Sequence, residues 1–277
     1  MLVHQRSFDP ARPQPAHRWF APLFDQFAER FAQPAGTADG FPCVFAQNAF
    51  RRRNVVFSLV GRRGGRHDFA ELADDLAKYL DAGQDWDGSP NTSEPLLAVF
   101  RPDPIPRTAG VYSRLFDTAL QYLIDHDPEP WPSHTHTDPG SPFWSMCFKG
   151  TQVFVNVSHP GHENRRSRNL CDALVLVINP RERFDRVAGD HEKGHAVRAQ
   201  IRHNVDLYDR LPRSPLLDHY LSGGLEWPQY DLPDDNTTPA RACPFRFTAG
   251  RSASPPAAVP WHVHRESAPA SAWRFAR

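Results

Sequence analysis

Apolar side chains recur every three to four residues in several stretches of the chain, which is the spacing of an amphipathic helix. This spacing predicts helices over residues 17–33, 67–82, 110–125 and 190–211, the last with only a sparse apolar line. Pro34 follows the first stretch and is expected to end that helix.

Short apolar runs between these helices predict strands. FPCVFAQNAF at 41–50 and NVVFSLV at 54–60 are expected as two short strands, or as a strand and its hairpin partner. LLAVF at 96–100 and ALVLVIN at 173–179 are continuous apolar runs, which are typical of buried strands. FWSMCF and TQVFVNV flank a Lys-Gly pair at 149–150, the pattern of a hairpin with a tight turn.

Helices and strands follow one another without regular alternation, which favours an α+β fold over a doubly wound sheet. We expect one domain, with a mixed, partly antiparallel sheet packed with helices. Residues 1–16 are expected to form a flexible N-terminal segment and residues 17–247 the folded domain. Residues 248–277, rich in Ala, Ser, Pro and Arg, are expected to be a disordered tail.

The charge balance excludes some classes of protein. The 277 residues carry 32 Lys and Arg against 32 Asp and Glu, a formal net charge of zero. Nucleic-acid binders and polybasic membrane anchors need a strong positive field, so neither nucleic acid nor a membrane is an expected partner. No apolar run approaches the roughly 20 residues of a membrane span, and no secretory signal is visible, so the expected location is the cytoplasm.

Four histidines lie in two pairs on either side of the predicted hairpin: His134 and His136 before it, His159 and His162 after it. Because a hairpin returns the chain to its starting end, the pairs could lie near one another. Imidazole is a common ligand of iron, zinc and copper. The alternative is that these histidines are exposed residues of polar loops.

His162 precedes the string ENRRSRN, in which Arg165 and Arg168 are three residues apart. Guanidinium groups bind carboxylates and phosphates in bidentate fashion. An imidazole beside such groups could bind a metal while the arginines hold an attached dianion, and haem has this distribution of charge. The alternative is a basic turn at the surface.

Two further features bear on chemistry. Cys43 lies in an apolar stretch, so a buried thiol is expected, and a thiolate ligand to haem iron is the other interpretation. Four acidic residues, Glu226, Asp231, Asp234 and Asp235, gather near Trp227 and Tyr230 late in the chain. Of these, Glu226, Asp234 and Asp235 are the candidates for binding a cationic substrate. The alternative for the aspartate pair is a turn in which their side chains cap local backbone.

Several strings in order resemble the YqcI/YcgG family, whose haem-dependent members N-oxygenate amino acids and guanidines. They extend from about residue 41 to 245 and are FPCVFAQNAF, DPEPWPSHTHTDP with FWSMCFKG, VFVNVSHPGHENRRSRN, VINPRERFD, IRHNVDLYDRLPRSPLLDHY and EWPQYDLPDDNTTPARACPF. The resemblance implies that residues 17–247 are a haem-binding catalytic domain. It also implies a monooxygenase that hydroxylates a nitrogen of an amino acid.

The activity that the resemblance implies is hydroxylation of the guanidino group of L-arginine to N-omega-hydroxy-L-arginine, in natural-product biosynthesis of the D-cycloserine type. The implied cofactor is haem b, with O2 or peroxide as oxidant and an external electron donor. His162 is the implied proximal ligand, and Arg165 and Arg168 would bind the propionates. His159 competes for the iron, because the chain departs from the usual family pattern just before His162, and no catalytic residue is assigned.

Two alternative functions remain open from the sequence. One is a non-haem metal oxygenase that uses the four histidines. The other is a non-catalytic haem-binding protein. Pro228 also replaces a residue that is usually basic in the family, which leaves the local substrate contacts open.

Overall fold

The computed structural model describes residues 1–105, 107–218, 223–237 and 242–247. Its centre is a six-stranded sheet in the order β1-β2-β5-β8-β7-β6. The strands β2 and β5 are parallel, and the other neighbours are antiparallel. The strands are β1 (Leu2–His4), β2 (Val56–Val60), β5 (Leu96–Phe100), β6 (Cys147–Phe148), β7 (Thr151–Ser158) and β8 (Val175–Pro180). This mixed sheet confirms the predicted α+β fold in a single domain.

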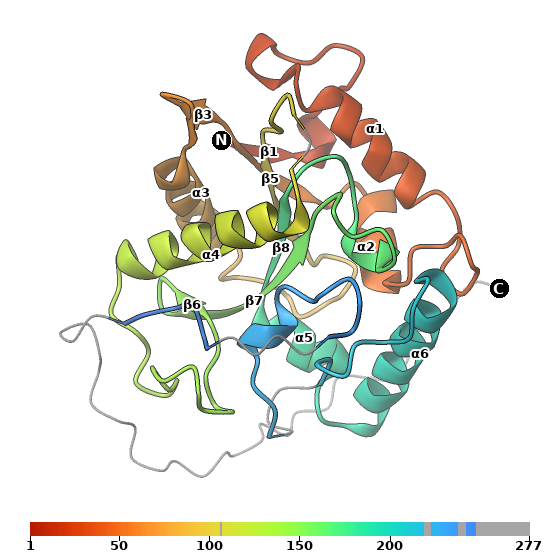
Figure 1. Cartoon of the computed structure of the whole chain (residues 1–277), viewed down its shortest axis with the longest axis vertical. Coiled ribbons are helices and arrows are strands. Elements are labelled where there is room, and N and C mark those ends of the chain that lie inside the picture. The colour runs from red at the N-terminus through yellow and green to blue at the C-terminus, as the bar shows by residue number, and fades with distance from the viewer. Residues whose placement is uncertain (106, 219–222, 238–241, 248–277) are drawn as a thin grey trace.

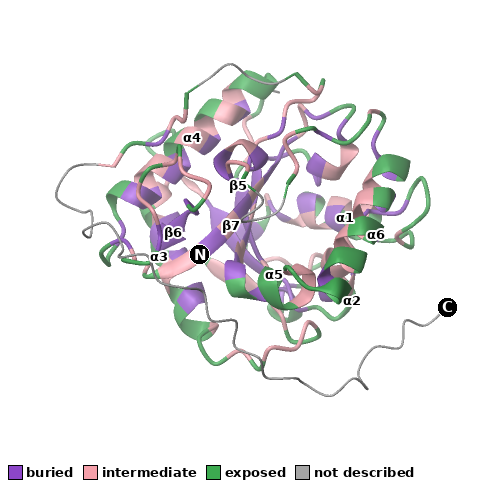
Figure 2. Ribbon diagram, turned by 90° about the horizontal axis from the view of Figure 1, so that it is seen from below, coloured by how far each residue is buried: buried purple, intermediate pink, exposed green. Residues whose placement is uncertain are grey.

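Helices cover both faces of the sheet. They are α1 (Ala21–Arg30), α2 (Val44–Arg51), α3 (Phe69–Ala82), α4 (Ala109–Asp125), α5 (Arg181–Ala188) and α6 (Glu192–Tyr208). Figure 2 shows the buried strands β5 and β7 between α3 and α4 on one side and α1, α2 and α6 on the other. A small two-stranded sheet, β3 (Arg62–Arg63) with β4 (Arg66–His67), lies outside this arrangement.

Burial on both faces explains the continuous apolar runs of the central strands. In β2, Val56 and Val60 belong to one hydrophobic cluster, whereas Phe57 and Leu59 belong to the cluster on the opposite face. Successive side chains of a strand point to opposite faces, so a strand covered on both sides needs apolar residues at every position. The predictions of β2, β5, β8 and the β6–β7 hairpin are therefore confirmed.

Two predictions of secondary structure are corrected. The stretch 41–50 was expected as a strand, but its residues from Val44 onward belong to α2. Gln47 turns inward on this helix, and its amide donates to the carbonyl oxygens of Gln33 at 2.6 Å and Phe41 at 3.2 Å. The charged helix α5 was not expected at all. It begins directly after β8, and its residues Arg181 and Arg183 are buried.

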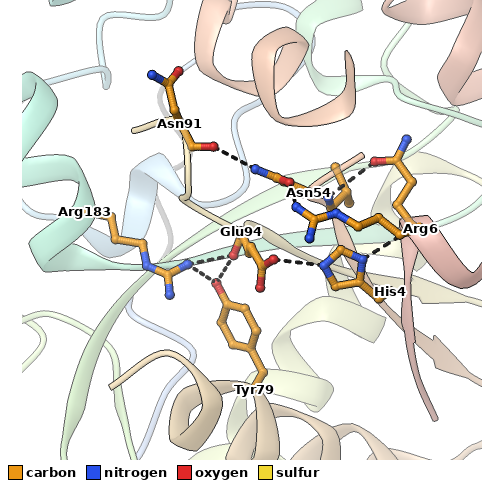
Figure 3. A network of polar contacts seen from close by, with 9 residues as sticks. His4, Arg6, Asn54, Tyr79, Asn91, Glu94 and Arg183 are labelled. Atoms are coloured by element: carbon orange, nitrogen blue, oxygen red, sulfur yellow. Dashed lines mark hydrogen bonds and ion pairs between the residues drawn. The ribbon is translucent and has the colours of Figure 1, made fainter. Parts of the chain in front are cut away.

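The N-terminal segment contains regular structure, and the flexibility expected for residues 1–16 stays a prediction. Leu2–His4 form the edge strand β1, paired antiparallel with β2, and Phe8 is buried in the core. The His4 imidazole lies 2.9 Å from the Glu94 carboxylate, as Figure 3 shows. Residues 248–277, expected to be a tail, lie outside the described residues.

The polar network of Figure 3 continues from Glu94 to the helices. The backbone oxygen of Glu94 accepts from the Tyr79 hydroxyl at 2.6 Å and from the Arg183 guanidinium at 2.7 Å. Arg183 donates to the Tyr79 hydroxyl as well, at 3.0 Å. These bonds join α3, α5 and the start of β5, so they position the second half of the chain on the first.

Within the described part of the chain, no helix has the length and apolarity to span a membrane.

Candidate functional site

The segment that follows β7, residues 159–169, forms a closed turn that we call the histidine loop. Its two ends are joined because the backbone N–H of His159 donates to the carbonyl oxygen of Arg168 at 2.9 Å. Inside the loop, the Asn169 side-chain amide donates to the backbone oxygen of His162 at 3.0 Å. Ser158, at the end of β7, accepts from the Leu170 N–H at 2.8 Å. The backbone that carries both histidines is therefore fixed by local bonds.

The two imidazoles of the loop are buried and stacked. His159 is 1% exposed and His162 is 2% exposed. Their ring centroids lie 3.9 Å apart with an interplanar angle of 20°. On its other side His159 stacks on the ring of Tyr112 from α4, at 4.9 Å. This column of three rings brings the end of β7 against the first turns of α4.

One nitrogen of each imidazole has no hydrogen-bond partner among the residues that the structure describes. His162 Nε2 lies 2.8 Å from the carbonyl oxygen of Leu232, which can only accept, so Nε2 carries the proton. Nδ1 of His162 is then the nitrogen with the lone pair, and it is buried without a partner, as is Nδ1 of His159. Burial lowers the pKa of His162, and burial with the neighbouring His162 lowers the pKa of His159 to about 3. Both rings are therefore neutral near pH 7, the form that binds metal ions.

A carboxylate completes this cluster. Asp231, whose side chain is 7% exposed, has Oδ1 3.9 Å from Nε2 of His159. One possible ligand atom from each of His159, His162 and Asp231 lies within 4.8 Å of the other two. Two neutral imidazoles and one carboxylate therefore meet in one buried place.

The segment 229–236 packs along the histidine loop, and the two predicted arginines join them. Arg168 is buried, and its guanidinium donates to the backbone oxygens of Tyr230 at 3.0 Å and Gln229 at 3.2 Å and to the Asn156 side chain at 2.5 Å. Burial lowers the pKa of Arg168 to about 10, and the nearby Arg165 adds to this effect. The Tyr230 oxygen also accepts from β7, next to which Figure 1 draws this segment in blue.

Arg165 makes similar bonds further along the segment. It is 1% exposed, and its guanidinium donates to the backbone oxygen of Pro233 at 2.9 Å and to the Asn236 side chain at 2.5 Å. Its Nη1, however, is buried and has no acceptor in the described parts of the chain. Arg165 and Arg168 are thus internal cross-links, and Nη1 of Arg165 is a donor that a bound carboxylate could satisfy.

Asp234 accepts backbone N–H groups of the histidine loop. Its carboxylate accepts from Glu163 at 3.1 Å, from Asn164 at 3.0 Å and from Arg165 at 2.6 Å. The Asn164 side-chain amide also donates to it, at 3.1 Å. The carboxylate thus holds the backbone directly after His162.

The other two acidic candidates lie in different surroundings. Glu226 is buried and forms an ion pair with Arg181, and it accepts from the hydroxyl groups of Ser145, at 3.0 Å, and Tyr230. Asp235 is exposed and accepts from the backbone and hydroxyl of Thr237. The structure therefore gives the three predicted substrate carboxylates three separate sets of partners, and substrate contact by them stays a prediction.

The remaining predicted ligands lie apart from the imidazole pair. His134 is exposed, and Nδ1 of His136 lies 2.8 Å from the Ser141 hydroxyl. Cys43 precedes α2, and burial raises the pKa of its thiol, which opposes the thiolate form that iron ligation requires. A surface groove of about 670 Å³ beside α3 shares no lining residue with the histidine loop.

The residues present fit an iron cofactor in part as the sequence implied. The unpartnered Nδ1 atoms of His159 and His162 are suitable ligands, and the Leu232 carbonyl is the hydrogen-bond partner that metal-binding histidines usually have on the other nitrogen. Arg165 Nη1 fits one haem propionate. Arg168 fits less well, because its guanidinium already donates to three oxygens.

Sequence reasoning did not single out Asp231, Leu232 or Tyr112. A carbonyl partner has no sequence signal, because every residue has a backbone oxygen. Asp231 stood within the acidic group near Trp227, but nothing in the order of residues distinguishes it from its neighbours. Its proximity to His159 depends on how segment 229–236 crosses the end of β7.

The chain is similar to proteins of known sequence over most of its length. Residues 31–246 match the YqcI/YcgG family. A Streptomyces lavendulae protein with the provisional name N(omega)-hydroxy-L-arginine synthase DcsA is 42% identical over 230 residues, which cover 83% of this chain and 84% of the relative. The uncharacterized protein YcgG of Bacillus subtilis is 29% identical over 251 residues, 88% of this chain and 95% of the relative. No solved structure matches this chain.

Proposed function

The chain belongs to the YqcI/YcgG family, and from this membership and the buried imidazole pair we propose that it is a haem-dependent N-oxygenase. Its proposed substrate is L-arginine, with N-omega-hydroxy-L-arginine as the product. The substrate comes from the name of the 42% identical relative. We also propose that the reaction belongs to natural-product biosynthesis of the D-cycloserine type, as the motifs of the sequence imply.

The proposal depends on two buried nitrogen atoms of the histidine loop, Nδ1 of His159 and Nδ1 of His162. His162 is the proposed ligand, since its Nε2–H bonds a carbonyl oxygen and its Nδ1 has no partner among the described residues. A buried nitrogen without a partner is costly in a folded protein unless a ligand satisfies it. Haem iron would do so, and haem, when bound, would supply the activation of oxygen.

The stoichiometry defines what else the reaction needs. Inserting one oxygen atom of O2 into an N–H bond and reducing the other to water consumes two electrons and two protons. The electrons come from an external donor, or hydrogen peroxide replaces O2 and the donor together.

Asp231 is the carboxylate we assign to the guanidinium of the substrate. It lies beside both imidazoles, whereas Glu226, Asp234 and Asp235 have the other partners described above. A carboxylate binds a guanidinium through two parallel charge-assisted hydrogen bonds. Asp231 would thus hold the guanidinium of the substrate next to the haem iron that His162 is proposed to bind.

The test is absorption spectroscopy combined with product analysis. Protein expressed with a haem precursor should show a Soret band and, with arginine, O2 and a reductant, should form a product one oxygen atom heavier. His162→Ala should lose the Soret band, whereas the exposed His134→Ala should keep it. If the protein binds no haem after reconstitution, haem is not its cofactor. If it shows a Soret band but forms no product, it binds haem but does not catalyse the proposed reaction.

One observation favours a second candidate function. Two imidazoles and a carboxylate, as in His159, His162 and Asp231, are the ligand set of many non-haem iron oxygenases. A non-haem enzyme would contain iron without porphyrin and would show no Soret band, so the same spectrum separates the two candidates.

A further inference from the structure

We propose that His162 presents Nδ1 to its ligand and that Asp234 is the positioning residue that holds it in this orientation. The inference rests on the proposed function for the identity of the ligand, an iron centre. The orientation of the ring and the role of Asp234 follow from the contacts of the protein itself.

The orientation of the ring follows from hydrogen bonding. The Leu232 carbonyl oxygen, 2.8 Å from Nε2, has no hydrogen to give. A neutral imidazole has a hydrogen on only one of its two nitrogens. In His162 this hydrogen is therefore on Nε2, and the free lone pair is on Nδ1. The Nδ1 lone pair lies in the plane of the ring, and Nδ1 has no hydrogen-bond partner among the described residues, so a ligand would bind there and not on the ring face that His159 covers.

Asp234 fixes the two parts that set this orientation. Its carboxylate accepts the N–H groups of residues 163–165, directly after His162. Asp234 itself is two residues after Leu232, whose carbonyl oxygen accepts the hydrogen bond from Nε2 of His162. One side chain therefore locks the backbone of the histidine to the backbone of its hydrogen-bond partner.

A carboxylate is the group this position requires. It offers only acceptors, and the four donors that meet it are three backbone N–H groups and the Asn164 amide. In Asp234→Asn, one oxygen becomes an NH2 group that faces donors, so at least one bond is lost and a donor is set against a donor. The loop is then expected to shift, and the bond from His162 to Leu232 to weaken.

The neighbouring residue provides a matched control. Asp235 has the same side chain and is one position along the chain, but it is exposed, and the described residue that donates to its side chain is Thr237. Asp235→Asn makes the same change in charge near Arg165 but removes none of the hydrogen bonds that Asp234 accepts from the histidine loop. A difference between the two variants is therefore due to place rather than to net charge.

The first measurement uses haem-free protein labelled with ¹⁵N-histidine. Long-range ¹H–¹⁵N spectra distinguish the Nε2–H from the Nδ1–H form, and the signals of His162 are those absent from His162→Asn. Wild type and Asp235→Asn should show the Nε2–H form, and Asp234→Asn a mixture of forms. An Nδ1–H form in the wild type overturns the inference without any need for the Asp234 variant to fold.

The second measurement titrates the same proteins with haemin and follows the Soret band. Asp234→Asn should bind haemin about 10- to 100-fold more weakly than wild type, the usual loss when a residue supporting a metal ligand is changed. Asp235→Asn should bind like wild type. Equal binding by Asp234→Asn and wild type overturns the positioning role. If the wild type does not bind haemin, the proposed function fails, and the ¹⁵N spectra still decide the orientation of His162.

Discussion

The rings of His159 and His162 stack in parallel with their centroids 3.9 Å apart. Two protonated imidazoles at this distance would repel one another in surroundings that exclude water. The stack is therefore stable with both rings neutral, which is also the form of imidazole that binds a metal ion, and both Nδ1 atoms have no hydrogen-bond partner among the described residues. Packing and metal chemistry impose the same protonation state on this pair.

This protonation state predicts loss of stability in acid. The pKa of His159 falls from its ordinary value of 6.5 to about 3 because of burial, so below pH 6.5 the unfolded chain binds a proton that the folded chain does not. The free energy of unfolding should therefore decrease as the pH falls, by about 1.4 kcal/mol per pH unit well below pH 6.5 from this residue.

Urea denaturation of haem-free protein between pH 7 and 4.5 measures this effect. His159→Gln removes the titrating group, so its stability should depend less steeply on pH than that of the wild type. The same slope in both proteins would show that His159 is protonated in the folded state.

Asp231→Asn should weaken the binding of arginine. Loss of a charge-assisted contact costs about 1.5–3 kcal/mol, which is roughly a 10- to 150-fold increase in the dissociation constant. The Soret band should remain, because Asp231 is assigned to the substrate and not to the iron. The shift of that band on titration with arginine gives the constant for the wild type and for the variant. An unchanged constant would remove Asp231 from the substrate site.

Much of the fold can be predicted from the sequence because burial on both faces leaves a plain signal. The run LLAVF at Leu96–Phe100 is apolar at every position and is β5. The segment at 44–51 was assigned wrongly because a short apolar run has no clear period, and the inward turn of Gln47, which bonds the Phe41 carbonyl, is a tertiary effect.

The site could be predicted less well than the fold, because its residues work through contacts distant in sequence. The histidines and arginines of the loop stand out as residue types. The arginines were expected to face a ligand, but Arg168 donates to the Tyr230 carbonyl, 62 residues away. Nothing in the order of residues shows that a guanidinium will donate to a backbone oxygen and not to a bound ligand.

This internal role of Arg168 predicts a large effect on stability. Arg168→Met removes three charge-assisted bonds, to the Asn156 side chain and to the backbone oxygens of Tyr230 and Gln229, and of these oxygens that of Tyr230 keeps its bond from β7. The free energy of unfolding should therefore fall by about 3 kcal/mol or more. Arg63, whose side chain is 89% exposed, is the control, and Arg63→Met should change stability by less than about 0.5 kcal/mol. Equal stability of the two variants would show that Arg168 faces a ligand instead.

Glu226 offers a parallel test of a buried ion pair. Glu226→Gln leaves the buried Arg181 guanidinium without its counter-charge, which should destabilise the fold by about 3–5 kcal/mol. Arginine binding by the fraction that stays folded should be unchanged, since Glu226 is occupied by Arg181 and Ser145. Denaturation and calorimetric titration together check this. A selective loss of arginine binding with normal stability would return Glu226 to the substrate site.

Gly161 tests the space next to the imidazole pair. A Cβ atom at this position would lie 3.1 Å from Nδ1 of His159 and 3.1 Å from Cα of Ala109. Both contacts are tighter than ordinary van der Waals distance, and the Ala109 backbone is held in α4, so His159 must shift and disturb its stack on His162. Gly161→Ala should therefore lower stability by about 1–3 kcal/mol and weaken haemin binding.

Gly110→Ala is the control, because among the described residues its Cβ would meet only the Arg114 side chain, at 3.7 Å, and alanine favours a helix by about 0.5–1 kcal/mol. Denaturation and haemin titration of both variants measure the two effects, and haemin binding by Gly161→Ala at wild-type strength would mean that the ligand does not depend on the placement of His159.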